Sequence, residues 1–189
     1  MSMPRFNWGF WSEAEPNIND RLIDVSRGKT IGGSSSINGM IYVRGNACDL
    51  DQWEELGAQG WGYRNCLPYY KKAENCAYGE DEYRGGDGPL HTCNGNGMKN
   101  PLYRAFIKAG GEAGYGITDD YNGYRQEGMC RMDMTVKNGV RCSTANAYLK
   151  PVLDRSNLTV LMHALTKRVV LEGKKAIGVE FERDGKTQM

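Results

Sequence analysis

The stretch from Arg27 to Met40 constrains the fold of this chain more than any other part of its sequence. It reads RGKTIGGSSSINGM, so four glycines and three serines lie within 14 residues. Glycine allows positive φ angles and a close approach of the backbone to a ligand. Serine hydroxyls and unpaired backbone N–H groups bind anionic oxygens such as those of a pyrophosphate. We therefore interpret the stretch as a loop that holds a dinucleotide cofactor, with a glycine- and serine-rich surface loop as the alternative.

Length, composition and charge narrow the class of protein. The 189 residues are enough for one domain or for parts of two. With 40% hydrophobic and 25% charged residues, the composition is that of a soluble globular protein. A net charge of +1 provides no basic surface for nucleic acid or for an acidic membrane. No apolar run approaches the ~20 residues that span a bilayer, so we expect neither a nucleic-acid partner nor a spanning segment.

The cysteines do not form a metal-binding or redox motif. The chain has six of them and no C-x-x-C pair, and neither histidine, His91 or His163, lies near a cysteine pair that could complete a zinc site. An even number of cysteines permits disulfides. A chain of this length without a signal peptide nevertheless favours reduced, mostly buried thiols. We predict no metal site.

Four helices are predicted, three of them from capping residues and apolar periodicity and a fourth, short one through Ala145, Ala147 and Leu149. Asp49 is placed to cap a helix over 50–56. A second helix covers 67–75, with Pro68 in its first turn, where proline is tolerated. Asn100 caps the third helix, which we expect to end at a glycine and to bury one apolar face in the core. That face consists of Leu102, Phe106, Ala109 and Ala113.

Strands are predicted from alternating and β-branched runs at 22–25, 89–93, 129–136, 168–171 and 176–183. In the run over 129–136, Arg131 and Asp133 are predicted on the polar face, whereas Met132 and Met134 are predicted on the apolar face. The last two strands are joined by a glycine-containing turn at 172–175, which is typical of a hairpin. Together with the helices, these strands indicate an α/β or mixed α+β class without an internal repeat.

Other segments carry weaker predictions. The polar, glycine-rich residues 77–100 are interpreted as a lid or cofactor cover, with a mobile connector as the alternative. Asp119 and Asp120 are predicted to form a turn rather than to act in acid–base or metal chemistry. The N-terminal segment contains aromatic residues that need a covering surface which nothing local supplies. They are Phe6, Trp8, Phe10 and Trp11.

The glycine–serine stretch also resembles the signature of a known enzyme family. Gly28 to Asn38, followed by Tyr42, Gly45 and Asp51 at matching spacings, is similar to the first signature of the glucose–methanol–choline (GMC) oxidoreductases, which use FAD to oxidise alcohols. Family-like segments continue along the chain, among them LPYYKKAE at 67–74, GDGPL at 86–90, DYNG at 120–123 and RCST at 141–144. Within the family, VRGNACDLD at 43–51 and MDMT at 132–135 favour the choline dehydrogenase subgroup.

The resemblance implies that the chain is an interior segment of a longer enzyme. It would contain part of an FAD-binding α/β domain and part of a substrate domain built on an antiparallel sheet. Residues 1–76 are expected to carry the signature loop and cover the flavin. Residues 77–149 are expected to belong to the substrate domain with its cover loop, and 150–189 to return as strands to the FAD-binding domain.

The resemblance also implies which residues contact the cofactor. The expected FAD-binding residues are Gly28, Gly32, Gly33, Ser34, Ser35, Asn38, Gly39 and Met40, with Thr166 beside the adenine. Some relatives carry a histidine bonded to the flavin just before the asparagine. Here that position is Ile37, so we expect FAD to bind non-covalently. The family's C-terminal histidine base has no counterpart in this sequence, and neither His91 nor His163 matches a family motif. We therefore assign no catalytic residue.

The implied function is that of an FAD-dependent alcohol dehydrogenase. Choline would be oxidised to betaine aldehyde by hydride transfer to flavin N5, as a step in glycine betaine synthesis. A family enzyme for another primary alcohol and a non-catalytic module derived from the family are the alternatives. This segment alone is expected to be inactive, because it lacks the base and part of the cofactor site. We expect a cytoplasmic location, with peripheral attachment to the inner membrane as the open alternative, and the sequence does not specify the electron acceptor.

Overall fold

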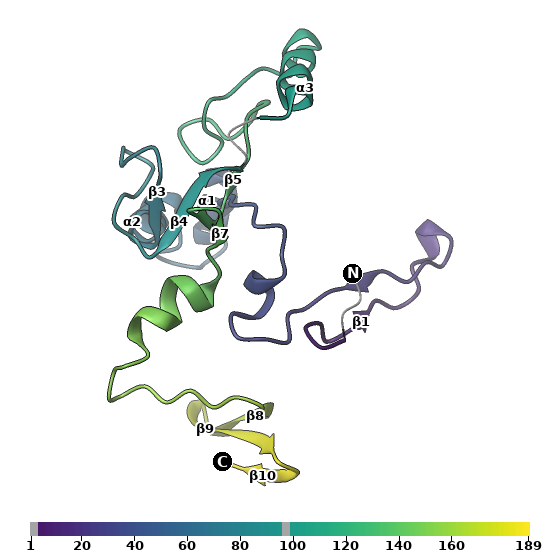
Figure 1. Cartoon of the computed structure of the whole chain (residues 1–189), viewed down its shortest axis with the longest axis vertical. Coiled ribbons are helices and arrows are strands. Elements are labelled where there is room, and N and C mark those ends of the chain that lie inside the picture. The colour runs from purple at the N-terminus through teal and green to yellow at the C-terminus, as the bar shows by residue number, and fades with distance from the viewer. Residues whose placement is uncertain (1–3, 96–98) are drawn as a thin grey trace. The chain divides into compact units, whose positions relative to one another are not determined.

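The chain divides into two units, and each of them contains regular secondary structure (Figure 1). The computed structural model describes residues 4–95 and 99–189. The first unit extends to Pro151, and the second is Val152–Met189. Helices and sheets occur together along the chain, which confirms the predicted mixed class. The division at residues 76 and 149 stays a prediction, and part of the predicted cover loop, residues 96–98, lies outside the described residues.

The N-terminal arm is a short two-stranded ribbon. Strand β1 (Phe10–Trp11) pairs antiparallel with β2 (Asp24–Val25), which confirms the second half of the strand predicted over 22–25. Asn7 ties the arm to the following loop, because its Oδ1 accepts from the Arg27 N–H at 2.9 Å. The aromatic side chains stay largely uncovered by the described residues. Trp11, for example, is 62% exposed.

Helix α1 (Ala47–Glu55) begins earlier than predicted. Its cap is Asn46 rather than Asp49, because the Asn46 Oδ1 accepts from the Cys48 N–H at 2.9 Å. Asp49 therefore lies in the first turn, where an acidic side chain complements the positive end of the helix dipole. The sequence rule identified the helix but chose the wrong one of two nearby capping residues.

Helix α2 (Tyr63–Ala73) also begins earlier than predicted, so Pro68 lies inside the helix rather than in its first turn. Gly62 is the N-cap, and the Tyr63 N–H donates instead to the Asp51 Oδ1 of α1 at 2.8 Å. A proline inside a helix leaves one carbonyl without its ladder partner. Here that carbonyl belongs to Arg64, an exposed residue, so water can solvate it.

Helix α3 (Pro101–Glu112) has the predicted bounds but not the predicted burial. The Asn100 Oδ1 accepts from the Leu102 N–H at 3.0 Å, and Gly114 follows the helix with a φ of +88°. The apolar face, however, is open. Leu102 is 72% exposed and Phe106 is 70% exposed. Placing this face in the core was wrong for the described residues, because no described element covers it.

A three-stranded sheet lies at the centre of the first unit. Strand β3 (Glu74–Cys76) pairs parallel with β4 (Leu90–Asn94), and β4 pairs antiparallel with β5 (Asp133–Met134). Strand β4 matches the strand predicted over 89–93 within one residue. The continuous strand predicted over 129–136 is wrong, because the chain leaves the sheet after β5.

A hairpin follows directly. Strand β6 (Val136–Lys137) pairs antiparallel with β7 (Val140–Arg141) across Asn138 and Gly139. Both turn residues have positive φ angles, 51° and 77°, which matches the twist of hairpin strands. After β7 the chain forms a π-helical turn, Ala145–Leu149, and a short 3-10 turn, Lys150–Val152.

The second unit contains an antiparallel sheet of three strands, in the order β10, β9, β8. They are β8 (Leu165–Glu172), β9 (Lys175–Arg183) and β10 (Lys186–Gln188), drawn towards the yellow end of the colour scale in Figure 1. The hairpin predicted at 172–175 is confirmed. Strand β10 was not predicted, although Asp184-Gly185 is one of the strongest hairpin signals in a sequence.

The interior of the first unit is built from charged and polar side chains. Glu74 on β3 and Thr92 on β4 are both below 2% exposure. The Glu74 Oε1 lies 2.6 Å from the Arg84 Nη2, and its Oε2 lies 2.7 Å from the Arg44 Nη2. Thr92 donates its hydroxyl to the same Oε1 at 2.6 Å. Both carboxylate oxygens are therefore paired, as a buried charge requires.

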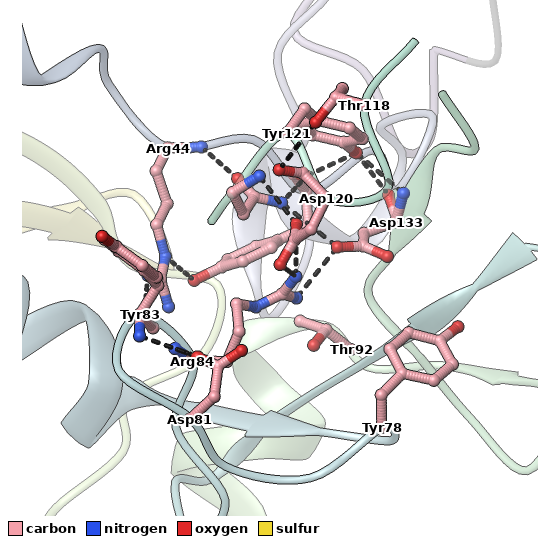
Figure 2. Close-up of polar contacts among 12 residues, drawn as sticks. Arg44, Tyr78, Asp81, Tyr83, Arg84, Thr92, Thr118, Asp120, Tyr121 and Asp133 are labelled. Atoms are coloured by element: carbon pink, nitrogen blue, oxygen red, sulfur yellow. Dashed lines mark hydrogen bonds and ion pairs between the residues drawn. The ribbon is translucent and has the colours of Figure 1, made fainter. Parts of the chain in front are cut away.

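Arg84 extends these contacts to β5 and the loop before it. Its Nη1 lies 2.8 Å from the Asp120 Oδ1, and its Nη2 lies 2.9 Å from the Asp133 Oδ2, as Figure 2 shows. We use the name buried ion cluster for Arg44, Glu74, Arg84, Asp120 and Asp133.

Two aspartates of the buried ion cluster, Asp120 and Asp133, were the subject of predictions, and only the prediction for Asp120 is confirmed. Asp120 forms a turn as predicted, since its Oδ1 accepts from the Asn122 N–H at 2.8 Å. Asp133 was predicted on the polar face of a strand, yet it is only 5% exposed. The prediction was wrong because simple alternation cannot foresee a buried arginine that pairs with the carboxylate.

Pairing shifts the titration of these groups. Burial raises the pKa of Glu74, but hydrogen bonds from Arg84 and Thr92 lower it more, so it lies below its usual value. Burial lowers the pKa of Arg84, but its bonds to Glu74 and Asp120 raise it above its usual value. Burial raises the pKa of Tyr121 to about 12. Its hydroxyl therefore stays protonated and donates to the Tyr42 carbonyl at 2.8 Å.

We predict that Glu74→Gln destabilises the natural protein that contains this sequence by about 3–5 kcal/mol, because two buried arginines lose their shared charge. Urea unfolding measures the change. The control is Glu80→Gln, whose carboxylate lies 3.4 Å from the Lys71 Nζ on the surface and whose loss should change stability by less than about 1 kcal/mol. Equal effects of the two substitutions would contradict the assignment.

The lowered pKa of Glu74 also predicts a pH dependence. Its stabilising contribution is complete above its unfolded value of 4.5 and is lost as the pH falls through the lower, folded value. The free energy of unfolding should therefore decrease in acid, and it should decrease less steeply in Glu74→Gln. Unfolding curves between neutral and acidic pH provide the comparison, and identical slopes would refute it.

Candidate functional site

The candidate site is the loop from Arg27 to Met40, which we call the glycine–serine loop. It contains one short 3-10 turn, Gly33–Ser36, preceded by Gly32 with a φ of +86°. All but one of the predicted FAD-binding residues lie on this loop. Thr166 is the exception: it lies on β8 in the second unit, opposite Phe181. Its role beside the adenine, like the roles of the loop residues, stays a prediction.

Two glycines of the loop are required by the loop's own packing. A Cβ on Gly28 would lie 2.2 Å from the Gly33 carbonyl oxygen, and one on Gly32 would lie 2.5 Å from the Ser36 Oγ. Real Cβ atoms do not approach backbone atoms so closely. The packing of the loop therefore explains why residue 28 is a glycine, without any contact to a ligand. Gly33 and Gly39, in contrast, have open space where a Cβ would be.

The serines bind the loop's own backbone. Ser34 Oγ accepts from the Gly28 N–H at 3.1 Å, and Ser36 Oγ donates to the Ile31 carbonyl at 2.8 Å. Ser35 Oγ donates to the Gly32 carbonyl at 2.5 Å. These hydroxyls hold the loop in shape, and any contact with a ligand would be additional to these bonds.

The last residues of the loop carry donors that can reach a ligand. Asn38 Oδ1 accepts from the Met40 N–H at 3.0 Å, which helps to hold Met40 at a φ of +65°. The Asn38 Nδ2 and the Gly39 N–H find no acceptor within the described residues. Donors of this kind suit the electron-rich oxygens and nitrogens of a dinucleotide.

A segment after the β6–β7 hairpin supports the loop. The Thr144 N–H donates to Ser35 Oγ at 2.9 Å, and the Thr144 hydroxyl donates to the Gly32 carbonyl at 3.2 Å. Arg141 donates from Nη1 to the carbonyl and side-chain oxygens of Asn38, both at 2.8 Å. This RCST segment resembles the family in sequence, but its sequence alone indicates no role. Its role as a support of the loop follows from hydrogen bonds between residues that are far apart in the sequence, and these contacts become visible only in the folded chain.

A cavity of about 370 Å³ lies beside the buried ion cluster, away from the predicted cofactor residues. Its walls include Tyr63, Tyr83, Tyr121, Tyr124, Asn46 and Gln126. The polar groups there satisfy one another, as the Asn46 Nδ2 donates to the Gln126 Oε1 at 2.8 Å. None of the predicted FAD-binding residues lines this cavity.

The histidines, cysteines and helices of the described residues form no further candidate site. Among the residues that the structure describes, no three His, Cys, Asp or Glu side chains are grouped as metal ligands. All six cysteines are free thiols. Within those same ranges, no helix combines the length and the apolar character needed to cross a bilayer. His91 lies 3.3 Å from the Asn75 Oδ1, and burial lowers its pKa.

We predict that Gly28→Ala destabilises the natural protein that contains this sequence, because the new methyl group overlaps the Gly33 carbonyl and forces the loop to move. A loss of about 1–3 kcal/mol is typical of such overpacking. Gly39→Ala is the matched control, since its φ is not positive and its Cβ would meet open space. Thermal unfolding of the two variants as apoproteins compares them without any contribution from bound cofactor, and equal midpoints would contradict the predicted overlap at Gly28.

The chain is similar to proteins named as oxygen-dependent choline dehydrogenases. It is 59% identical over 186 residues to the oxygen-dependent choline dehydrogenase of Vibrio vulnificus, covering 98% of this chain and 33% of that protein. It is 56% identical over 189 residues to the protein of the same name from Photobacterium profundum, covering 100% of this chain and 33% of that protein. The chain therefore spans about a third of the length of these relatives.

Solved structures show the same fold. Pyridoxine 4-oxidase from Mesorbium loti superposes with a TM-score of 0.84 at 31% identity, over 97% of this chain and 36% of that one. An FAD-dependent oxidoreductase from Chaetomium thermophilum superposes with a TM-score of 0.84 at 26% identity, over 100% of this chain and 35% of that one. The family profile described as GMC oxidoreductase matches residues 12–189. The chain therefore belongs to the GMC oxidoreductase family.

Proposed function

We propose that this chain is part of an FAD-dependent alcohol dehydrogenase and that its alcohol is choline, oxidised to betaine aldehyde for glycine betaine synthesis. The observation that carries the proposal is the 59% identity, over 98% of this chain, to a relative named oxygen-dependent choline dehydrogenase. Because the chain spans about a third of that relative, the remaining walls of the active site would come from other parts of a longer protein.

The glycine–serine loop has the properties that an FAD site requires. Gly33 and Gly39 leave open space where a side chain would stand, and the Gly39 N–H and Asn38 Nδ2 are available as donors. Arg141 adds a positive charge that has no carboxylate partner within the described residues. When bound, FAD supplies the acceptor for the hydride that leaves the alcohol carbon.

Exposed apolar surface supports the proposal of a longer protein over that of an independent module. Trp11, Leu102 and Phe106 are each more than 60% exposed. Leu102 and Phe106 are four positions apart on α3 and so form one exposed apolar face, and contiguous apolar surface on a soluble protein usually contacts another part of the protein or a partner. A free-standing module would leave this surface in water, so we rank that alternative below the enzyme.

No residue of this chain is assigned as the catalytic base. His91 bonds to Asn75, and His163 lies in an irregular segment of the second unit. The base that accepts the proton of the alcohol hydroxyl would come from outside this sequence. The electron acceptor and the location in the cell stay predictions.

The proposal is tested by substrate preference. The natural protein that contains this sequence should oxidise choline with a kcat/KM at least about tenfold above that for an uncharged alcohol of similar size, because a quaternary ammonium gains from aromatic and ionic contacts. 3,3-Dimethylbutan-1-ol, which replaces the nitrogen by carbon, is the matched control substrate. A preference for the uncharged alcohol would instead support the alternative of another family substrate.

A second alternative is pyridoxine-like alcohols. It is favoured by one observation, the 31% identity to a solved structure named pyridoxine 4-oxidase. Including pyridoxine in the same assay separates it from the choline proposal, since the preferred substrate gives the highest kcat/KM. The identity to that structure is much lower than the 59% to the choline-named relative, so choline remains the first proposal.

We also predict that the flavin is bound without a covalent link. Ile37 precedes Asn38, and its saturated side chain offers no nucleophile to the flavin. Acid precipitation of the natural holoprotein should release all of the FAD into the supernatant, where its absorbance is measured. Flavin retained in the washed pellet would show a covalent bond at another residue and overturn this prediction.

A further inference from the structure

Arg141 makes an unusual set of contacts with the glycine–serine loop. A single nitrogen, Nη1, donates to the Asn38 Oδ1 at 2.8 Å, the Asn38 carbonyl at 2.8 Å and the Ser35 carbonyl at 3.2 Å. Arg141 lies at the end of β7, more than 100 residues along the chain from Asn38. Its carbonyl is held in turn, because the Asn146 Nδ2 donates to it at 2.8 Å.

These contacts fix the orientation of the Asn38 amide. Its Oδ1 accepts from two donors, the Arg141 Nη1 and the Met40 N–H. A flipped amide would turn its NH₂ group toward both donors and lose both hydrogen bonds. The observed orientation therefore leaves Nδ2, a donor, as the amide atom available to a ligand.

We propose that Arg141 is the positioning residue of the cofactor site and that it holds the Asn38 amide so that a donor, not an acceptor, faces the flavin. This inference rests on the proposed use of FAD. A donor with a nearby positive charge favours the electron-rich, reduced cofactor over the oxidised one. Arg141 therefore sets the affinity for FAD and its reduction potential through Asn38.

A purely structural role for Arg141 makes a different prediction. Thr144 also ties the hairpin segment to the loop, through Ser35 and Gly32, but it does not touch Asn38. Thr144→Val removes the hydroxyl contacts of that tie without changing the side-chain shape. If holding the loop were the whole role of Arg141, then Arg141→Met and Thr144→Val would have the same kind of effect.

The test uses the natural full-length holoprotein and measures the Kd of FAD for the apoprotein, the flavin midpoint potential and the thermal midpoint of the apoprotein. In Arg141→Met, we expect the Kd of FAD to rise about tenfold, because one charge-assisted hydrogen bond is lost. We also expect the flavin midpoint potential to become more negative. Arg141→Lys should restore most of both. Thr144→Val should lower the thermal midpoint and leave the potential unchanged.

Asn38 provides the decisive comparison. Asn38→Ala alone should lower the potential, and adding Arg141→Met to it should lower the potential less than Arg141→Met does in the wild type, because the two residues act through one contact. If Arg141→Met does not fold, Arg141→Gln replaces it. An unchanged potential in Asn38→Ala, or an Arg141 effect that persists in full without Asn38, would overturn the inference.

The failure of this inference is distinguishable from that of the proposed function. If the wild-type protein binds no FAD, the proposed function and the inference both fail. If the wild type binds FAD and the Arg141 variants keep the wild-type Kd and potential, only the inference fails.

Discussion

The first unit depends on the pairing of one buried carboxylate with two arginines. Glu74 forms ion pairs with Arg44 and Arg84. Arg84 also forms ion pairs with Asp120 and Asp133. The interior around them contains few apolar side chains, so burial of apolar surface contributes less here than in an ordinary core. Paired charges are stable in such a place only when every member keeps its partner. The ion pairs of the first unit therefore depend on one another, and the loss of one member weakens the remaining contacts.

The sequence could predict local features of the fold and not the contacts that join them. The cap at Asn100 and the turn at 172–175 could be predicted because their signals lie within a few neighbouring residues. The buried ion cluster was not, since Arg44 and Asp133 are 89 positions apart (133 − 44) and nothing near either residue shows the other. Helix α3 shows the converse, because its periodicity correctly marked an apolar face but could not show that no described element covers it.

The candidate site divides in the same way. The glycine–serine loop was identified from its composition, and its role in binding FAD stays a prediction. Composition could not show which glycines the packing of the loop requires and which leave space open. Gly28 is required by the packing, whereas Gly39 leaves space open. The sequence did not identify Arg141 and Thr144 as supports of the loop, because they approach it only in the folded chain. Residues of this kind support a site although they lie outside the sequence motif by which the site is identified.

The long range of the Arg141 contact has a consequence for synthesis on the ribosome. A growing chain emerges N-terminus first, at roughly 5–20 residues per second. The glycine–serine loop leaves the ribosome early, yet the residues that hold Asn38 and Ser35 emerge about 100 residues later. For several seconds the loop therefore lacks its supports, and the cofactor would meet a settled site only after the hairpin has formed. The order of events is set by where Arg141 stands in the sequence.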